Sequence, residues 1–226
     1  IGGDRIMDRS EIGFSPANGQ AYRQALEEAS GGIISTGPMG SGKTSLNLSA
    51  LKEFIKQGHK IVTLEDPVEM RLPAGVTQVS IDPAQDMNWT DVMPTVLRSA
   101  AKVLFLGEIN KKDIAHLAIE AALTGHLMLS TLHTNDAPGS VVRLREMGIR
   151  PSVLADSLRC VVAQRLPRRL CVCKVPAAPT ERNIRDFRLD PSVIAGTQWF
   201  TPRRGGCEAM RPPCTARSFV YLRSRA

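Results

Sequence analysis

The stretch ISTGPMGSGKTSLNL, residues 34–48, decides the fold of this 226-residue chain. It contains the pattern G-x-x-x-x-G-K-[ST], which lies between an apolar run and a segment with helical periodicity. A phosphate-binding loop requires that placement, because its glycines let backbone N–H groups surround phosphate oxygens at a helix N-terminus. The pattern predicts that a nucleotide is bound by Gly37, Pro38, Met39, Gly40, Ser41, Gly42, Lys43, Thr44 and Ser45.

Two side chains of this loop have separate expected roles. The Lys43 ammonium is expected to reach the β- and γ-phosphates, and the Thr44 hydroxyl to coordinate Mg²⁺. A flexible glycine loop is the alternative interpretation, but it gives no reason for a lysine and a threonine in this register. The pattern therefore favours a nucleotide with Mg²⁺ as the cofactors.

Apolar strand-like runs alternate with helix-like segments up to about residue 166. The strand-like runs are at 31–36, 60–66, 76–81, 102–108 and 126–134, and the helix-like segments are at 43–57, 90–100, 111–123 and 136–148. Thr90 is expected to cap the second of these helices, with Pro94 in its first turn. The alternation predicts an α/β fold with a mainly parallel sheet flanked by helices on both faces. Ligands of such sheets bind at the carboxyl ends of the strands.

Acidic residues follow two of the predicted buried strands. Glu65 and Asp66 end the run KIVTLED, and Glu108 follows Gly107 at the end of VLFLGE. Carboxylates at strand ends can orient a water molecule near a γ-phosphate or help to hold Mg²⁺. For Glu65 and Asp66, a helix cap or a solvated turn is an equally good interpretation. Glu108 is expected to contact Mg²⁺ through water or to polarise the attacking water.

Two histidines, His126 and His133, bracket the strand-like run LMLSTL. A lone histidine is more often structural than catalytic, but the neighbouring segments here hold the phosphate loop and Glu108. We therefore expect one of the pair in the nucleotide site, where it would sense the γ-phosphate. His59 and His116 are interpreted as ordinary surface or packing residues.

The last quarter of the chain differs in composition from the rest. Residues 167–226 hold seven prolines and show no clear periodicity, which predicts a small irregular subdomain or a poorly ordered tail after a domain at 1–166. The net charge of the chain is +7, and residues 171–226 contribute 10 Lys and Arg against 4 Asp and Glu. This basic region permits an anionic partner or a plain solvated surface.

Together these segments resemble the secretion ATPases of bacterial type II secretion and type IV pilus assembly. The resemblance rests on the phosphate loop, on VTLEDPVE as an acidic box, on VLFLGEIN as the second phosphate-loop motif and on ALTGHLMLSTLHTNDA as a histidine box. It implies a RecA-like core that binds and hydrolyses ATP with Mg²⁺ in a homohexameric ring. It further implies a cytoplasmic motor, peripheral to the inner membrane, that works with inner-membrane platform and secretion or pilus components.

The same resemblance assigns roles to individual residues. It implies that Glu65 positions water, that Glu108 is the acid of the second motif, and that His133, with His126, contacts the γ-phosphate. Arg98 lies where the family carries an arginine before that motif. The sequence departs from the family after Glu108, where Asn110 and Lys111 stand in place of arginine and aspartate.

The cysteines depart from the family pattern of two CxxC pairs, which suits tetrahedral zinc. The first pair is CVC, and Met210 stands where a ligand is expected after Cys207. Two interpretations stay open, a metal-free remnant and a Zn²⁺ site formed by Cys171, Cys173, Cys207 and Cys214. The chain is also expected to lack the family's N-terminal domain, which supplies arginines to a neighbouring subunit, and therefore to hydrolyse ATP feebly.

Two other functions compete with the ATP-driven motor. One is a nucleotide-responsive scaffold with little hydrolysis, which the change after Glu108 favours. The other is a nucleic-acid translocase, which the basic tail allows. Aromatic residues make up only 4% of the chain and do not interleave with basic residues, so the stacking platforms of a strand-binding channel are missing from the pattern. No apolar run approaches the roughly 18 residues of a membrane helix.

Overall fold

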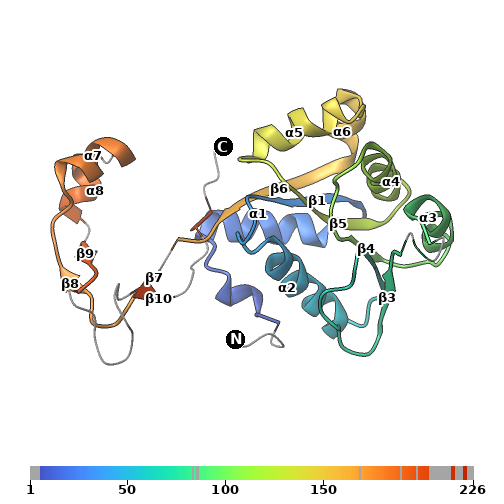
Figure 1. Ribbon diagram of the computed structural model, residues 1–226, viewed down its shortest axis with the longest axis horizontal. Coiled ribbons are helices and arrows are strands. Elements are labelled where there is room, and N and C mark those ends of the chain that lie inside the picture. Colours follow the sequence, from blue (N-terminus) through green and yellow to red (C-terminus); the bar gives the residue numbers. More distant parts are fainter. Residues whose placement is uncertain are drawn as a thin grey trace. The chain divides into compact units, whose positions relative to one another are not determined.

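The computed structural model describes residues 6–82, 84, 87–167, 169–188, 190–196, 198–203, 215–216 and 221–222 (Figure 1). The chain divides into two compact units at the bond between Leu166 and Pro167. The last described strand, β11 (Tyr221–Leu222), belongs to the first unit because it pairs with β6 (Leu158–Arg165).

The first unit is built on one sheet. Within the described residues its strand order is β11-β6-β1-β5-β4-β2-β3. Every neighbouring pair is parallel except β11 with β6, so the predicted mainly parallel sheet is confirmed. The sequence pattern does not predict β6 or β11 as strands. The other strands are β1 (Gly31–Thr36), β2 (Ile61–Glu65), β3 (Val76–Ser80), β4 (Val103–Leu106) and β5 (Leu127–Leu132).

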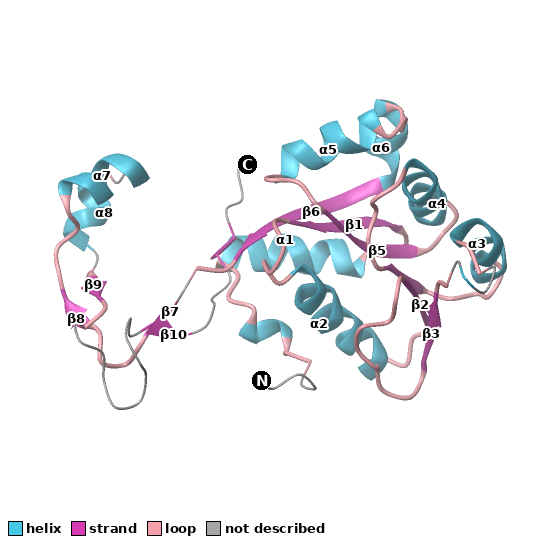
Figure 2. Cartoon of the chain, viewed as in Figure 1, coloured by secondary structure: helices cyan, strands magenta, loops and turns pink. Residues whose placement is uncertain are grey.

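Helices cover both faces of this sheet (Figure 2). Strand side chains alternate between the two faces, so Ile33 packs against one group of helices and the adjacent Ile34 against the other. The first group comprises α1 (Pro16–Glu27) and α2 (Lys43–Lys56), with the short 3₁₀ helix η1 (Arg9–Glu11) beside α2. The second comprises α3 (Trp89–Leu97), α4 (Lys112–Leu123), α5 (Ala137–Glu146) and α6 (Pro151–Ser157).

The start of α3 differs from the prediction. The N-cap residue is Asn88 rather than Thr90, and Pro94 lies inside the helix, past its first turn. The indole of Trp89 packs against the core, so burial of this side chain extends the helix toward its N-terminus. Pro94 cannot donate a backbone hydrogen bond to the carbonyl of Thr90, so α3 lacks one of its helical hydrogen bonds.

The second unit consists of short elements. In its described residues, β7 (Arg169–Leu170) pairs with β10 (Thr215–Ala216), and β8 (Val175–Pro176) pairs with β9 (Phe200–Thr201), both antiparallel. Helix α7 (Glu181–Phe187) has a capping box formed by Thr180 and Asn183, and α8 (Pro191–Gly196) follows it. The Lys174 ammonium lies 4.0 Å from the centre of the Phe200 ring, a cation–π contact. None of the helices described in either unit is long and apolar enough to span a bilayer.

Candidate nucleotide site

Four neighbouring strands of the first unit end at the same edge of the sheet. The phosphate loop follows β1, His133 follows β5, Glu108 follows β4, and Glu65 is the last residue of β2. Because β5 lies between β1 and β4, the histidine lies between the phosphate loop and the acid. A cavity of about 410 Å³ opens here, lined by Met39, Gly40, Lys43, Thr44, Glu65, Asp66, Pro67, Glu69, Trp89, Phe105, Gly107, Glu108, Asn110, Thr131 and His133.

The glycines of the phosphate loop adopt backbone conformations that other residues avoid. Gly37 has φ 148° and Gly42, the N-cap of α2, has φ 86°. A Cβ atom on Gly37 would lie 2.4 Å from the Gln164 carbonyl oxygen, and one on Gly42 would lie 2.8 Å from Nε2 of the same glutamine. Strand β6 therefore packs so closely against the loop that a Cβ at Gly37 would overlap its backbone, and the positive φ values favour glycine at both positions.

Lys43 is held against the loop that precedes it. Its Nζ donates hydrogen bonds to the carbonyl oxygens of Gly37 (3.1 Å) and Pro38 (3.2 Å), and the residue is 8% exposed. Burial lowers the pKa of Lys43, and the negative charge of Glu108 opposes that shift. A partly desolvated ammonium at a helix N-terminus is electrostatically complementary to phosphate.

Glu65 is neither a helix cap nor part of a solvated turn. It is 6% exposed at the end of β2, where its Oε1 accepts hydrogen bonds from Thr63 Oγ1 (2.7 Å) and Gln78 Nε2 (3.2 Å). The adjacent Asp66 is exposed, and both residues line the cavity. Gln78 on β3 thus fixes the direction of the Glu65 carboxylate, a role that the sequence did not reveal.

Glu108 and His133 lie next to each other in the lining of the cavity. His133 Nε2 lies 3.5 Å from Glu108 Oε2, and their side chains are 44% and 41% exposed. The preceding Gly107 accepts a hydrogen bond from Thr131 Oγ1 (2.8 Å) at its carbonyl oxygen, which fastens the end of β4 to β5. The strand tips therefore bring together the acid and the histidine that the sequence assigned to one site.

His126 lies at the opposite edge of the sheet. It precedes β5, and its carbonyl oxygen accepts a hydrogen bond from the backbone N–H of Gly31, at the start of β1 (3.0 Å). The phosphate loop follows the other end of β1, so a full strand length separates the two. His126 is 7% exposed and does not line the cavity. We therefore do not retain it as a cofactor-binding residue.

The remaining loop positions differ in exposure. Met39 is 91% exposed and Ser45 is exposed on the first turn of α2. The Ser41 hydroxyl is buried and has no hydrogen-bond partner among the described residues. Thr44 lines the cavity, as expected for a residue that coordinates Mg²⁺. Arg98, at the C-terminal end of α3, is exposed and does not line it.

Four carboxylates line the cavity beside a single lysine, those of Glu65, Asp66, Glu69 and Glu108. A phosphate group at Lys43 would be repelled by this set unless a cation lay between them. Carboxylate and hydroxyl oxygens are the ligands that Mg²⁺ prefers. The donor set therefore fits a nucleotide bound together with Mg²⁺, for which Thr44 and Glu108 are the candidate residues.

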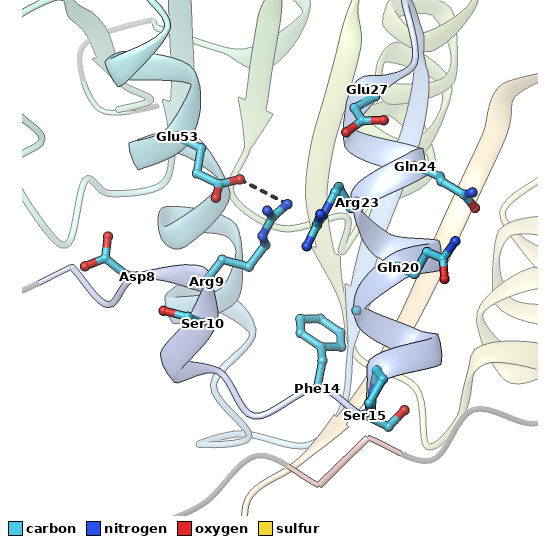
Figure 3. Close-up of a pocket in the computed structure, with 12 residues that line it drawn as sticks. Asp8, Arg9, Ser10, Phe14, Ser15, Gln20, Arg23, Gln24, Glu27 and Glu53 are labelled. Atoms are coloured by element: carbon cyan, nitrogen blue, oxygen red, sulfur yellow. Dashed lines mark ion pairs between the residues drawn. The ribbon is translucent and has the colours of Figure 1, made fainter.

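A larger cavity, of about 900 Å³, lies between η1, α1 and α2 and contains no residue of the phosphate loop (Figure 3). Arg9 and Arg23 point into it, and Arg9 pairs with Glu53 at 3.2 Å. Its lining mixes acidic and basic groups and lacks strand-end residues, so we place the nucleotide in the smaller cavity.

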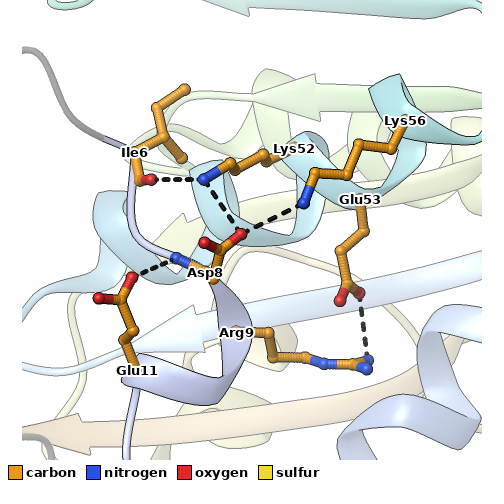
Figure 4. A network of polar contacts seen from close by, with 7 residues as sticks. All are labelled: Ile6, Asp8, Arg9, Glu11, Lys52, Glu53 and Lys56. Atoms are coloured by element: carbon orange, nitrogen blue, oxygen red, sulfur yellow. Dashed lines mark hydrogen bonds and ion pairs between the residues drawn. The ribbon is translucent and has the colours of Figure 1, made fainter.

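The segment that forms one wall of the larger cavity is fastened to α2 by a polar network (Figure 4). Asp8 Oδ1 lies 3.0 Å from Lys52 Nζ and 3.4 Å from Lys56 Nζ, and Lys52 also donates to the carbonyl oxygen of Ile6. The hydrogen bonds from Lys52 and Lys56 lower the pKa of Asp8. This network holds η1 against the helix that begins at the phosphate loop.

The predicted zinc ligands belong to the second unit. Cys171 is buried and Cys173 is half-buried. Cys207 and Cys214, with Met210, lie outside the described residues. The fifth cysteine, Cys160 on β6, is half-buried, and burial raises the pKa of its thiol to about 11.

A parallel sheet with a phosphate loop after an inner strand and acids at the neighbouring strand tips defines a P-loop nucleotide-binding domain. Residues 4–221 match the model of the type II/IV secretion system proteins, and the chain belongs to that family. It is 42% identical over 190 residues to the type IV pilus assembly ATPase PilB of Myxococcus xanthus, covering 83% of this chain and 33% of that protein. It is 40% identical over 191 residues to the type II secretion system ATPase E of Vibrio cholerae, covering 83% and 38%. The chain thus spans about a third of the length of these relatives.

Solved structures support the same fold. The pilus retraction motor PilT, crystallised with bound ADP, has a TM-score of 0.61 and 26% identity, and the match covers 73% of this chain and 50% of PilT. The ATPase DotB of Legionella pneumophila has a TM-score of 0.64 at 23% identity, covers 84% of this chain and 56% of DotB, and shows likeness of fold alone. The expected RecA-like core is confirmed by these neighbours and by the sheet topology.

Proposed function

We propose that this chain binds and hydrolyses ATP with Mg²⁺ as the motor domain of a type IV pilus assembly or type II secretion machine. One observation carries the proposal. Lys43, Thr44, Glu108 and His133, from three separate segments of the sequence, line one cavity at the carboxyl edge of the sheet. Membership in the secretion family and the names of the relatives support the same activity.

The chain's own residues would divide the work as follows. The loop N–H groups and Lys43 would hold the phosphates, and Thr44 and Glu108 would hold the Mg²⁺, whose charge would offset the repulsion between phosphates and carboxylates. Glu65, whose carboxylate accepts hydrogen bonds from Thr63 and Gln78, would orient the attacking water. His133, which lies 3.5 Å from Glu108, would donate a hydrogen bond to the γ-phosphate.

At the level of the whole machine, we propose a homohexameric ring peripheral to the inner membrane, where hydrolysis drives movement of pilin-like or secretion components. The support is family membership alone. Light scattering after size exclusion, with and without a non-hydrolysable ATP analogue, tests the ring. A chain that stays monomeric with the analogue, at concentrations at which it is saturated, contradicts it.

Phosphate release by the chain with ATP and Mg²⁺ tests the activity itself. Lys43→Ala is expected to lose nucleotide binding, and Glu108→Gln to bind nucleotide but release phosphate about 100-fold more slowly or worse. Arg145→Ala, which removes an exposed cation outside the cavity, is the control and is expected to keep wild-type turnover. Equal turnover by Glu108→Gln and wild type contradicts the assignment.

A nucleotide-responsive scaffold is the second candidate, and one observation favours it. Asn110 lines the cavity at a position where the family resemblance implies arginine, so the site has one cation fewer to stabilise a transition state. The scaffold predicts tight nucleotide binding with the same negligible phosphate release from wild type and Glu108→Gln. Asn110→Arg is then expected to raise turnover.

Zinc binding by Cys171, Cys173, Cys207 and Cys214 stays a prediction. Cys171 and Cys173 are close enough in sequence to bind one ion, but one residue separates them where zinc-binding pairs usually have two or more. Metal analysis of the purified chain tests it, with one equivalent of Zn²⁺ expected from wild type and none from Cys171→Ser.

A further inference from the structure

We infer that Thr36 is a positioning residue for ATP hydrolysis, whose hydroxyl fixes the place of His133 relative to the phosphate loop. The inference rests on the proposed function and deepens it. Thr36 is the last residue of β1, immediately before Gly37, and it is fully buried. Thr36 lies just outside the G-x-x-x-x-G-K-[ST] pattern, which begins at Gly37.

The hydroxyl of Thr36 contacts the backbone on both sides of His133. Its Oγ1 lies 2.9 Å from the Leu132 carbonyl oxygen and 3.1 Å from the Thr134 carbonyl oxygen. The same atom accepts a hydrogen bond from the backbone N–H of Thr134 (3.0 Å) and lies 2.6 Å from the Thr134 hydroxyl. A hydroxyl has one proton and two lone pairs, so donation to one carbonyl oxygen leaves it able to accept from both Thr134 groups.

These contacts continue the link between two strands beyond the end of the sheet. The ladder between β1 and β5 ends where Thr36 pairs with Leu132. The phosphate loop departs from one strand at that point, and the segment with His133 departs from the other. The Thr36 hydroxyl holds the two departing segments together where the backbone no longer does.

The link also reaches the next helix. The Thr134 hydroxyl lies 2.7 Å from Ser140 Oγ and 3.0 Å from the Asp136 carbonyl oxygen, and Asp136 caps α5 by accepting from the Gly139 N–H. The backbone on either side of His133 is therefore anchored to β1 and to α5. Its side chain remains 44% exposed in the cavity, opposite Glu108.

The consequence concerns rate more than affinity. The phosphate loop grips the nucleotide through its own amides and Lys43, which do not depend on Thr36 side-chain contacts. The alignment of His133 with the terminal phosphate depends on how the two segments are spaced, and a displacement of about 1 Å in a reacting group can cost 10²-fold in rate. Loss of the hydroxyl should therefore lower kcat and leave nucleotide affinity nearly unchanged.

Three variants of the full chain test this. Thr36→Val keeps the shape of the side chain and removes the hydroxyl. Thr36→Ser keeps the hydroxyl and removes the methyl group. Thr124→Val is the matched control, because the Thr124 hydroxyl also bonds a backbone carbonyl, that of Glu120, at the opposite end of β5 (2.8 Å). ATP turnover, binding of a fluorescent ADP analogue and thermal unfolding are measured for each.

Thr36→Val is expected to lower kcat about 10- to 100-fold while its ADP-analogue Kd stays within about twofold of wild type. Thr36→Ser and Thr124→Val should retain wild-type kcat within about threefold. Unchanged turnover by Thr36→Val overturns the inference. So does a loss of kcat matched by an equal loss of affinity or by unfolding at the assay temperature, since this would indicate a merely structural role.

If wild type binds nucleotide but does not hydrolyse it, the proposed function fails and a second measurement decides the inference. The His133 ring signals in an NMR spectrum are identified by their loss in His133→Asn. At fixed pH with ADP bound, Thr36→Val is expected to shift these signals, whereas Thr36→Ser and Thr124→Val leave them in place. Unshifted signals in Thr36→Val contradict the positioning role.

Discussion

Gly37→Ala provides a test of how closely the phosphate loop packs on the sheet. The alanine Cβ would lie 2.4 Å from the Gln164 carbonyl oxygen and 2.5 Å from Ser41 Oγ. The first of these is a backbone atom of β6 that cannot rotate away. The residue would also have to keep φ at 148°, which L-residues rarely adopt.

Two terms set the size of the effect. Unfavourable backbone conformation costs about 1–2 kcal/mol, and overlap in a packed site costs about 1–3 kcal/mol. Gly58→Ala is the control, because Gly58 has φ 74°, a Cβ there meets nothing within 4 Å and the residue lies outside the nucleotide cavity. The control therefore carries a positive-φ backbone cost but no overlap. The difference between the two variants is expected to be about 1–3 kcal/mol, equivalent to about 2–12 °C in Tm for a chain of this size.

The assay combines thermal unfolding with titration of a fluorescent ADP analogue. If the loop keeps its position, Gly37→Ala lowers Tm relative to Gly58→Ala. If the loop moves to relieve the overlap, the same free energy appears as weaker binding, about 5- to 140-fold. Equal Tm and equal affinity for the two variants would refute the argument that β6 confines the loop.

Three further predictions concern other parts of the chain. Trp89 lines the nucleotide cavity, so addition of ADP and Mg²⁺ is expected to change its fluorescence. The Trp89 signal is the emission of wild type minus that of Trp89→Phe. If this signal is the same with and without ADP and Mg²⁺, the nucleotide binds elsewhere. The pKa of Asp8 is lowered in the folded chain, so its contacts with Lys52 and Lys56 stabilise the chain at pH values above 3.8 and are lost as pH falls through the lowered pKa. Asp8→Asn should therefore lower Tm modestly at pH 7 but not near pH 2, and the same deficit at both pH values contradicts the electrostatic cause. Pro94→Ala, within α3, should raise Tm because alanine provides the backbone N–H donor that proline lacks. An unchanged or lowered Tm would show that Pro94 does not destabilise the helix.

Much of the nucleotide site was predictable because its signals are local. The phosphate loop depends on the order of glycines, lysine and threonine along a few residues, and that order fixes a strand–loop–helix junction wherever the segment lies. Strand ends are also visible, since apolar runs stop where polar residues begin. Strand-end residues can therefore be identified without knowledge of which strands are neighbours, as for Glu65, Glu108 and His133.

The errors have a common origin. His126 is predicted as a site residue because it adjoins the same strand as His133. The two histidines flank β5 at its two ends, however, and those ends lie at opposite edges of the sheet. The boundary of α3 was set by burial of Trp89, which depends on distant residues. Gln164 and Thr36 gave no signal, because each acts through contacts with segments more than 90 residues away or through the close packing of β6 on the loop.

The sequence by itself determined that a phosphate loop joins a buried strand to a helix, and that acids and a histidine follow other strands. Only the tertiary structure decided that β5 lies between β1 and β4, so that His133 stands between the loop and Glu108. The physical reason is the distance along the sequence between the residues that determine each feature. Loop conformation and strand boundaries follow from the chemistry of adjacent residues, whereas strand order follows from burying both faces of one sheet at once, to which the whole domain contributes.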